Sequence, residues 1–454
     1  MVQGMYQGIN FGVRRSNVAP SARRARAFKQ GMVRAVRHVG LSGLLLIATA
    51  VSSQTANPEW VGMSSERLAR IGPVVTSEVA KGTVPGAVTL IARDGKIVHF
   101  EANGFLDNNK TKPMPKEAVF RAYSMTKPFV SVATMMLMEE GRLQMGDPIS
   151  KWMPELKDMK VTTAQRDASG TVTVETLVPA RREITVQDLL RHTSGLVYSG
   201  SASVKSVGEA YVKVDIESRE KDLSANEFIG ELGKIPLASQ PGTHWEYSIS
   251  TDVLGILLER VTGKRLDHLL DAMLFKPLGM KDTSFQAQAR DLGRLADAFD
   301  TDPLKKAVWD SARIEKDPSL RYFRGGAGAV TTAYDYYLFL QMIANGGEFK
   351  GQRFLSKKVV EYMLSDHSQG TTGSPISSTG PGYGFGLGFA VRRQDGLGVA
   401  PGSAGDAMWA GAGGTSFTID PKERIVGVIM TAGPGTRGYT RMMFKNLIYG
   451  AVIK

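Results

Sequence analysis

The hydrophobic positions near the start of the chain predict a helix followed by two strands. Residues 64–82 read SSERLARIGPVVTSEVAKG, with Ser65 as a candidate helix cap. The apolar positions that share one helical face are Leu68, Ile71, Val75 and Val79. Residues 87–104, AVTLIARDGKIVHFEANG, form two strand-like runs around Asp94-Gly95, a dipeptide that suits a type I′ hairpin turn. A helix and an antiparallel hairpin are therefore expected in this order.

The pattern becomes mainly helical from residue 120 to about residue 320, and strands return after that. The helical runs are SMTKPFVSVATMMLMEEG, ITVQDLLRHTSG, SANEFIGELGK and TDVLGILLERVTGKRLDHLLDAML, and only TVTVETLVP (171–179) is typical of a strand there. A further helix is expected after Thr332, which has Asp335 in capping-box spacing. The strand-like runs GYGFGLGFAVRR, GTSFTID and ERIVGVIMTA follow, and RMMFKNLIYGAVI is expected to end the chain as a helix.

Strands at both ends of the chain and helices between them predict the domain organisation. We expect a fold of the α/β plus all-α class, in which an antiparallel sheet is flanked by the terminal helices. Residues 57–119 and 321–454 would form this α/β domain, and residues 120–320 would form a helical domain inserted into it. A length of 454 residues agrees with more than one core.

Residues 1–56 form a basic leader that changes the interpretation of the net charge. They contain eight of the 56 Lys and Arg residues and none of the 44 Asp and Glu residues, so the leader carries most of the formal charge of +12. The run VGLSGLLLIATAV (39–51) is shorter than the about 20 residues of a membrane-spanning helix, and it suits the apolar region of a signal peptide. Ala48-Thr49-Ala50 would be the cleavage site, and translation could start at Met1 or at Met32.

We therefore expect an exported protein, located in the bacterial periplasm, with no stable membrane span once the leader is removed. A mitochondrial location is an alternative because the leader is rich in Arg and free of acidic residues, and a cytoplasmic location with a buried N-terminal helix is another.

Composition argues against several classes of function. Without the leader the charge is nearly balanced, so we expect no nucleic-acid partner. The chain has no Cys, and its six His residues show no metal-binding spacing, so we expect no metal and no other cofactor. The sequence lacks G-x-S-x-G, and its Gly-rich runs GGAG, GYGFGLG and GAGG are better explained by close backbone packing than by phosphate binding.

The motif S-x-x-K occurs twice, and the surroundings of the two copies differ. Ser218–Lys221 lies in the charge-dense run DIESREKD, where a lysine stays solvated. Ser124 and Lys127 lie in FRAYSMTKPF, where Pro128 places the start of a helix near Ser124 and the apolar run FVSVATMMLM follows. This copy is either a nucleophile beside a lysine whose pKa is lowered by burial, or a helix cap with a lysine that extends to solvent.

A second candidate hydroxyl belongs to Tyr247 in PGTHWEYSISTDVLGILLERVTG (241–263). It lies in a loop just before a helix that would begin near Ser250 or Thr251, so it could point into a cleft or pack as a loop aromatic. His244 lies among turn residues without an assignable acidic partner, which argues against a Ser-His pair.

Together these runs resemble the serine β-lactamase and penicillin-recognising hydrolase superfamily. The similar segments are YSMTKPF, EEGRLQMGDPISKWMPE, LLRHTSGL, EYSISTDVLGILLERVTG, KPLGMKDTSF and WAGAGGTSFTIDP, which cover nearly all of the chain after the leader in the right order. Within the superfamily, the sequence is most similar to the class C-like esterases known as family VIII carboxylesterases. The resemblance implies a β-lactamase-like fold.

The resemblance also implies roles for individual residues. Ser124 would be the acylated nucleophile, Lys127 would take its proton, and Tyr247 would relay that proton to the leaving group and later activate water. Trp409-Ala410-Gly411 would be the strand that walls the substrate cleft. The backbone N–H groups of Ser124 and Ala412 would form the oxyanion hole. His192, in HTSG, would belong to a structural turn.

Two departures from the lactamase pattern bear on the substrate. The tyrosine motif Y-x-N is replaced by Tyr247-Ser248-Ile249, which puts an apolar residue at a substrate-binding position. The motif K-T-G is replaced by Trp409-Ala410-Gly411, which has neither the lysine nor the threonine that attracts a substrate carboxylate. Both changes are similar to the esterase branch and favour neutral esters.

The sequence therefore predicts a serine hydrolase that cleaves small carboxylic esters through an acyl-enzyme. A β-lactamase, a D-amino-acid peptidase or another amide hydrolase of the same fold is the first alternative, and a non-catalytic binding scaffold is the second. The acyl and alcohol groups of the substrate and the oligomeric state are left open.

Overall fold

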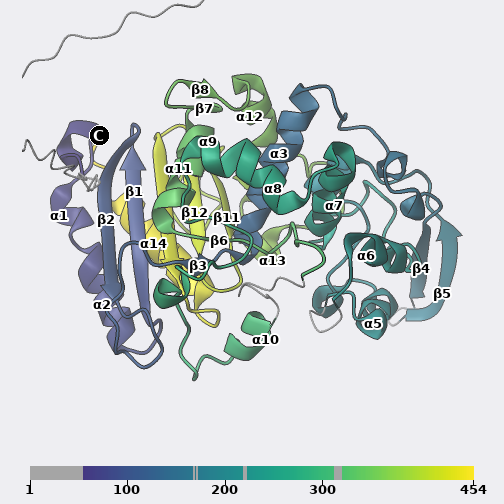
Figure 1. Ribbon diagram of the computed structural model, residues 1–454, viewed down its shortest axis with the longest axis horizontal. Coiled ribbons are helices and arrows are strands. Elements are labelled where there is room, and N and C mark those ends of the chain that lie inside the picture. Colours follow the sequence, from purple (N-terminus) through teal and green to yellow (C-terminus); the bar gives the residue numbers. More distant parts are fainter. Residues whose placement is uncertain (1–54, 167–168, 170–171, 218–221, 311–319) are drawn as a thin grey trace, which may run out of the picture. The chain divides into compact units, whose positions relative to one another are not determined.

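An antiparallel sheet of seven strands lies at the centre of the fold (Figure 1). The computed structural model describes residues 55–454 apart from 167–168, 170–171, 218–221 and 311–319. Across the sheet, the strands are β2 (Lys96–Gly104), β1 (Gly86–Arg93), β13 (Ile425–Thr431), β12 (Ser416–Asp420), β11 (Ala407–Ala410), β10 (Ala390–Arg392) and β9 (Tyr383–Phe385). Strands from the two ends of the chain thus form one sheet.

The junction between the two ends is the pairing of β1 with β13. Ala87 pairs with Thr431 and Arg93 with Ile425, while the other edge of β1 pairs with β2. Every residue of β1 is buried, which explains its nearly continuous apolar sequence GAVTLIAR. In the turn between β1 and β2, Asp94 and Gly95 both have positive φ angles, 53° and 71°. The prediction of a type I′ turn is therefore confirmed.

Helices cover both faces of this sheet. On one face, α1 (Ser65–Leu68), α2 (Ile71–Ala80) and α14 (Arg437–Gly450) enclose an apolar cluster that includes Ile91, Ile429 and Phe444. On the other face, α11 (Ala333–Ala344) packs against β1, β12 and β13, and α3 (Lys127–Glu139) lies in the same large core. These layers agree with the β-lactamase-like fold that was expected.

The remaining elements lie mostly in the middle of the chain. The helices are α4 (Val186–Leu190), α5 (Lys205–Val214), α6 (Ala225–Leu232), α7 (Ser250–Thr262), α8 (Leu266–Leu270), α9 (Lys276–Leu278), α10 (Lys305–Asp310), α12 (Lys357–Met363) and α13 (Ile376–Thr379). The short strand pairs are β3 (Phe120–Arg121) with β6 (Val330–Thr331), β4 (Lys160–Arg166) with β5 (Val172–Pro179), and β7 (Glu348–Phe349) with β8 (Gln352–Arg353). In Figure 1, α5, α6, β4 and β5 lie on the side away from β1 and β2.

Three details differ from the sequence-based expectations. The helix expected over 64–82 is two helices, and Ser64 rather than Ser65 caps the first by accepting from Arg67 N at 3.3 Å. The strand over 171–179 has a partner, β4, that the pattern did not indicate. Thr332 caps α11 by accepting from Asp335 N at 3.1 Å. The Asp335 carboxylate accepts from Asp282 N and Thr283 Oγ1 instead of completing a capping box.

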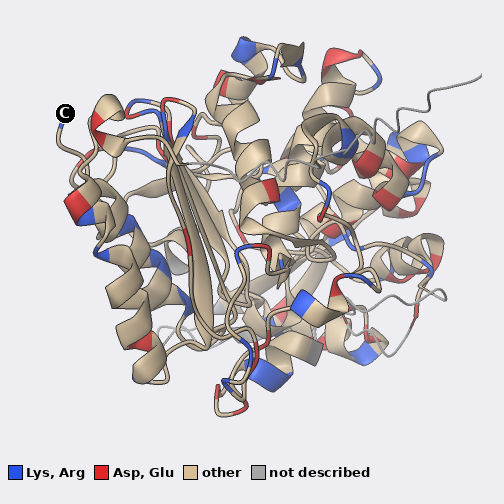
Figure 2. Ribbon diagram, turned by 60° about the vertical axis from the view of Figure 1, so that its left-hand side comes forward, with Lys and Arg blue, Asp and Glu red and all other residues tan. Residues whose placement is uncertain are grey.

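Charged residues concentrate on the outer helices and loops, and the sheet is largely free of them (Figure 2). A buried group of charges at α14 is an exception. Asp406, which is fully buried, accepts from Arg392 Nε at 2.7 Å and from Lys445 Nζ at 2.9 Å. Because unpaired charges are costly in the interior, this group holds α14 in one position against β10 and β11.

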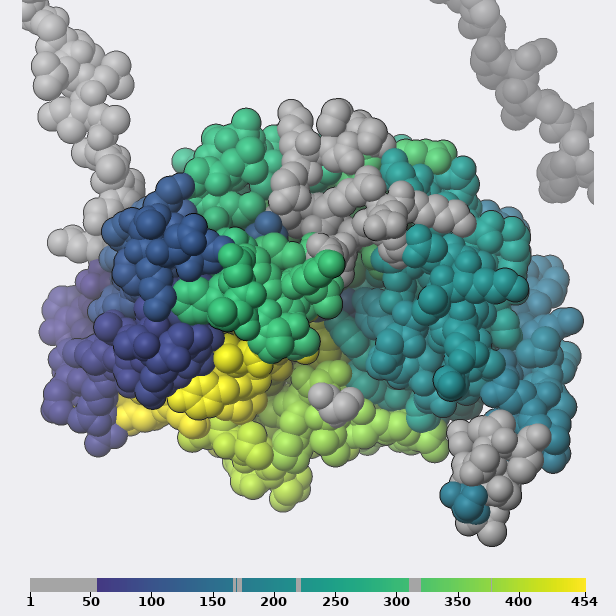
Figure 3. Space-filling model, turned by 90° about the horizontal axis from the view of Figure 1, so that it is seen from below, coloured from purple at the N-terminus to yellow at the C-terminus, as the bar shows by residue number. Residues whose placement is uncertain are grey.

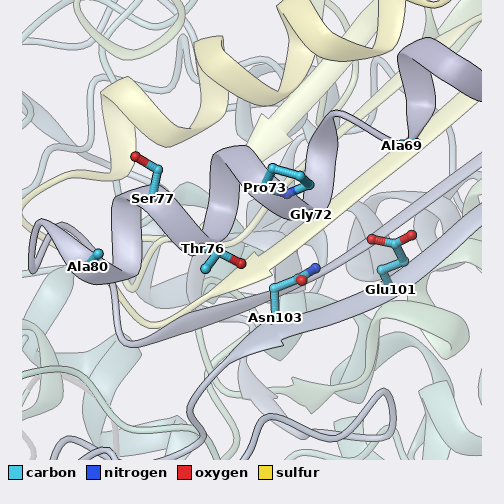
Figure 4. Close-up of a pocket in the computed structure, with 8 residues that line it drawn as sticks. All are labelled: Ala69, Gly72, Pro73, Thr76, Ser77, Ala80, Glu101 and Asn103. Carbon is cyan, nitrogen blue, oxygen red and sulfur yellow. The ribbon is translucent and has the colours of Figure 1, made fainter.

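A hollow of about 690 Å³ lies between α2 and the edge strand β2 (Figure 4). Its lining consists of small or polar residues: Ala69, Gly72, Pro73, Thr76, Ser77, Ala80, Glu101 and Asn103. No residue that the sequence suggested for chemistry lines this hollow.

Several expectations lie beyond these observations. The leader falls almost entirely outside the described residues, so export to the periplasm stays a prediction, and Ser218–Lys221 also falls outside them. The described residues from 55 to 454 belong to one compact unit, and the division into an α/β domain and an inserted helical domain stays a prediction. Among the described residues, no helix has both the length and the apolar character needed to cross a membrane.

Candidate active site

Ser124 lies in a 3₁₀ turn, Tyr123–Thr126, that runs directly into α3. The helical turn thus begins one residue before Ser124, and Pro128 occupies the first turn of α3, where its missing N–H costs nothing. Tyr123, just before the serine, has a φ of 46°, which is rare for a bulky residue. The backbone immediately before Ser124 is therefore strained, and the packing around the buried Tyr123 holds it in place.

The side chains of Ser124, Lys127 and Tyr247 converge. Tyr247 Oη donates to Ser124 Oγ at 2.7 Å, and Lys127 Nζ lies 3.4 Å from the same oxygen. Lys127 Nζ also lies 4.8 Å from the centroid of the Tyr247 ring. The structure thus brings together three groups that are up to 123 residues apart in the chain. A hydroxyl in contact with a phenol and an amine is an arrangement in which a proton can leave the serine.

Lys127 is buried with only 1% of its surface exposed, yet its ammonium group is well hydrogen-bonded. It donates to the carbonyl oxygen of Gly326 at 2.9 Å and to Tyr198 Oη at 3.2 Å. Burial by itself lowers the pKa of Lys127, but the negative charges that Tyr198, Tyr247 and Asp252 can carry raise it, and the net pKa lies above that of a free lysine. The sequence predicted a net lowering of this pKa, and the net shift is in the opposite direction because the neighbouring groups outweigh burial.

A buried ion pair contacts the loop whose carbonyl group binds Lys127. Asp252 of α7 accepts from Arg324 Nε at 3.1 Å and from Gly326 N at 3.3 Å. A Cβ on Gly326 would lie 2.5 Å from Asp252 Oδ2, so only glycine fits at this point. Gly325 is equally close to α7, since its Cβ would lie 2.5 Å from Thr251 O. Close packing, the expected explanation for GGAG, is confirmed here, and it fixes the carbonyl group that binds Lys127.

Tyr198 is a site residue that the sequence did not reveal. It is half-buried in the loop after HTSGL, and its ring lies 5.3 Å from that of Tyr247 and 5.5 Å from Lys127 Nζ. No spacing connects Tyr198 to the S-x-x-K motif, which is 71 residues away in the chain. Tyr198 comes close to Lys127 because its loop pairs with the segment around Tyr247. In this pairing, Ile249 N donates to Val197 O at 3.4 Å.

Tyr247 lies between aromatic residues in the loop that precedes α7, which begins at Ser250 as expected. Its ring is 4.9 Å from His192 and 5.3 Å from Trp409. His192 is buried, and burial together with the charge of Lys127 holds its pKa well below the usual value, so it is neutral. Its Nδ1 contacts Ser248 Oγ at 3.0 Å, and its φ of 57° agrees with a turn. His192 therefore positions Tyr247 and does not touch Ser124.

The strand β11 and the turn after it run beside Ser124. Trp409 is 4% exposed on β11, and Ala412 is half-buried in the turn. A Cβ on Gly411 would lie 2.4 Å from the carbonyl oxygen of Ala122, two residues before Ser124. Glycine is therefore required where this strand approaches the serine turn, and the approach brings the backbone of Ala412 near Ser124.

Two other candidate residues lie elsewhere. Ile249 is fully buried in the hydrophobic core, so it has no surface with which to contact a substrate in this structure. His244 contacts Thr372 Oγ1 at 2.9 Å through Nδ1, in a turn apart from Ser124. In the part of the chain that the structure describes, no group of three or more acidic or histidine side chains could hold a metal ion.

Comparisons with known proteins agree with this geometry. The model of the beta-lactamase family matches residues 73–448. This chain belongs to that family. It is 32% identical over 354 residues to Protein Rv1367c of Mycobacterium tuberculosis, covering 76% of this chain and 85% of the relative. It is 30% identical over 402 residues to Esterase EstB of Burkholderia gladioli, covering 84% of this chain and 95% of the relative.

A solved structure shows the same likeness. EstCE1, described as a hydrolase with promiscuous acyltransferase activity, is 27% identical and superimposes with a TM-score of 0.68 over 85% of this chain and 99% of its own. The similarity to family VIII carboxylesterases is therefore confirmed, and the chain is a serine hydrolase of the β-lactamase-related class.

Proposed function

We propose that the protein hydrolyses small, neutral carboxylic esters through an acyl-enzyme on Ser124. The observation that carries the proposal is the contact of Ser124 Oγ with Tyr247 Oη at 2.7 Å, beside a buried Lys127. An esterase among the relatives supports the same chemistry. A nucleophile in reach of a proton acceptor, which is itself held by a third group, is the usual arrangement for acyl transfer.

In the first half of the reaction, Ser124 Oγ attacks the ester carbonyl carbon as its proton passes to the pair of Tyr247 and Lys127, which acts as the general base. The tetrahedral intermediate collapses when the C–O bond to the alcohol breaks and Tyr247 returns the proton to the departing oxygen. Water then attacks the acyl-enzyme by the same sequence and releases the carboxylic acid. The ammonium group of Lys127 stabilises the negative charge that passes between these oxygens.

The carbonyl oxygen of the substrate becomes negatively charged during each attack, so hydrogen-bond donors are needed to stabilise it. The backbone N–H groups of Ser124 and Ala412 are the proposed oxyanion hole. The contact of Gly411 with the carbonyl of Ala122 supports this, because it holds the turn that contains Ala412 beside the serine turn. Removing one such donor costs about 3 kcal/mol in other hydrolases.

A neutral substrate is proposed because the strand that lines the cleft offers no cation. Trp409 and Ala410 occupy the positions where a lactamase has lysine and threonine, and Trp409 packs edge-on against Tyr247 instead of presenting a charge. An anionic substrate would therefore lack the charge-assisted hydrogen bonds that compensate for its desolvation.

The decisive experiment compares short-chain p-nitrophenyl esters with a chromogenic cephalosporin and a D-Ala-D-Ala peptide. We expect ester turnover to exceed turnover of the other two substrates. Ser124→Ala should lower kcat by at least about 1,000-fold and abolish labelling by a fluorophosphonate, since the covalent step is lost. Ser218→Ala, which removes the serine of the second S-x-x-K, is the matched control and should retain both activities.

Other outcomes would point elsewhere. Rapid cephalosporin or peptide hydrolysis with negligible ester cleavage would identify an amide hydrolase of the same fold. Absence of labelling in the wild type would indicate a binding scaffold.

A further inference from the structure

Trp309 lies beside the serine turn without a role in the proposed chemistry. It belongs to α10, its side chain is half-buried, and its ring centroid is 6.1 Å from that of Tyr123, the residue before Ser124. A Cβ on Gly413 would lie 3.7 Å from Trp309 Cζ3, and Ala412 packs against the same small apolar cluster. The indole therefore contacts both segments that carry the proposed oxyanion donors.

The ring of Trp309 is fixed in place, and part of its surface is left uncovered. The Arg121 guanidinium lies 4.8 Å from its centroid and covers one part of the ring. The indole Nε1 is buried, and no hydrogen-bond partner for it is found among the described residues. A fixed aromatic surface at the edge of a cleft is suited to contact a ligand. Figure 3 shows the surface hollowed next to the green segment that contains α10, between it and the teal helical segments.

Trp309 and Tyr247 lie at opposite ends of the segment that lines the cleft. Trp409, at the start of this segment, has its ring 5.3 Å from Tyr247, whereas Gly413, at its end, adjoins Trp309. Between these two residues the chain leaves β11 and makes a turn, in which Gly414 N donates to Gly411 O at 3.2 Å. When an ester carbonyl is attacked by Ser124, the alcohol must lie toward Tyr247, which returns the proton to it. The other substituent of the carbonyl, the acyl chain, must then point toward Trp309.

We propose that Trp309 forms the end wall of an acyl subsite and restricts the enzyme to short, apolar acyl groups. This inference rests on the proposed esterase function. A short acyl chain fits between the serine turn and the indole, while a longer chain meets the ring. The rigid support from Tyr123 and Arg121 prevents the ring from moving aside. The alcohol side of the ester is not affected by Trp309.

The test measures kcat/KM for p-nitrophenyl acetate, butyrate and octanoate in the wild type, Trp309→Ala and Trp309→Phe. Each methylene that gains a buried position improves kcat/KM by about fourfold, so Trp309→Ala should raise the octanoate-to-acetate ratio by at least about tenfold. Trp309→Phe, which keeps an aromatic wall but shortens it, should give a smaller increase. A series of acetate esters with different alcohols should keep its order in all three proteins. Trp60→Ala, at a tryptophan that is 75% exposed, is the control.

The outcomes separate this inference from the proposed function. If the wild type cleaves none of the esters, the proposed function fails. If it cleaves them but neither variant changes the octanoate-to-acetate ratio by more than about twofold, the acyl subsite is wrong and the esterase remains. If Trp309→Ala does not fold, the ratio in Trp309→Phe decides. An equal change in the acyl and alcohol series would also overturn the inference, since it would indicate a general disturbance of the site.

Discussion

At the scale of single residues, the groups around Lys127 favour its charged form. A lysine buried among carbon atoms loses its proton easily, but Lys127 faces two tyrosine rings, a carbonyl group and, behind that carbonyl, an aspartate. Its pKa is raised above that of a free lysine, which favours the charged ammonium form. In the mechanism that we propose, the serine proton therefore passes to Tyr247, which makes the shorter contact with Ser124.

Tyr198 is expected to position Lys127 without contacting substrate. In Tyr198→Phe, Lys127 Nζ loses one hydrogen-bond acceptor, so kcat should fall by about tenfold, the effect of one hydrogen bond of ordinary strength. KM for p-nitrophenyl butyrate should change by less than about twofold, because the ground-state contacts of the substrate remain. Steady-state kinetics of this variant and of Tyr362→Phe, which removes a hydroxyl near the surface, measure the difference. A change in KM alone would contradict the positioning role.

The sequence located part of the candidate site and missed part of it for a physical reason. Ser124 and Lys127 are one helical turn apart, so local spacing reveals them, and the loop before α7 marks Tyr247. Tyr198 and Trp309 lie on separate loops and helices whose docking depends on tertiary packing, which leaves no local pattern. The sequence showed that Lys127 is buried, but the sign of its pKa shift depends on neighbours that spacing cannot place.

At the scale of elements, the position of β11 against the serine turn depends on one glycine. In Gly411→Ala, the new Cβ would lie 2.4 Å from both Ala122 O and Thr415 Oγ1, so the strand or the turn must move. We expect the free energy of unfolding to fall by about 1–3 kcal/mol and kcat/KM to fall by at least about tenfold. Urea unfolding and ester kinetics check both values.

A matched control for this prediction is Gly230→Ala in α6, where an added Cβ meets no atom within 4 Å. This change should raise stability by about 1 kcal/mol, because alanine favours a helix, and it should leave activity unaltered. Wild-type activity in Gly411→Ala would show that β11 does not position the oxyanion donors.

Elements with strong local signals were predicted well, and those that depend on a partner were not. The hairpin of β1 and β2 follows from Asp94-Gly95, whose backbone angles the sequence already favours. The strand β4 has mixed polar and apolar residues, KVTTAQR, and is defined by its pairing with β5 and by a bridge from Val161 to Leu237. The break between α1 and α2 near Arg70 interrupts a continuous apolar stripe, so periodicity could not reveal it.

At the scale of the whole molecule, burial favours the neutral form of two core histidines, His99 and His192, so stability depends on pH. His99 on β2 is buried, contacts Thr89 Oγ1 at 2.8 Å through Nε2, and burial lowers its pKa to about 4. Its folded-state pKa lies below the unfolded value of 6.5, so its contribution to stability is complete above pH 6.5 and is lost as the pH falls toward 4.

We therefore predict that His99→Asn reduces the acid sensitivity of the protein. The loss of unfolding free energy between about pH 7.5 and pH 4.5 should be smaller than in the wild type by about 2–3 kcal/mol. Urea unfolding at the two pH values measures it, with His268→Asn, at an exposed histidine, as the control. Equal acid losses in the wild type and in His99→Asn would contradict the prediction.

The fold class was predictable because helical and strand patterns segregate along the chain. The strands of the seven-stranded sheet lie within residues 86–104 and 383–431, and most of the helices lie between these two ranges. The strand order was not predictable, since the apolar strands β1, β12 and β13 could pair in several ways without violating their patterns. Their actual order follows from packing helices on both faces at once.

The meeting of β1 with β13 has a consequence for synthesis. Thr431 Oγ1 donates to the carbonyl of Gly86, 345 residues earlier, so a chain leaving the ribosome carries the β1–β2 hairpin for most of translation before its neighbour arrives. During that time one edge of a mostly apolar strand is open to any other chain with a free edge. A circularly permuted gene that begins at β9 would deliver β13 before β1, and it should yield more soluble protein in the cell than the natural order.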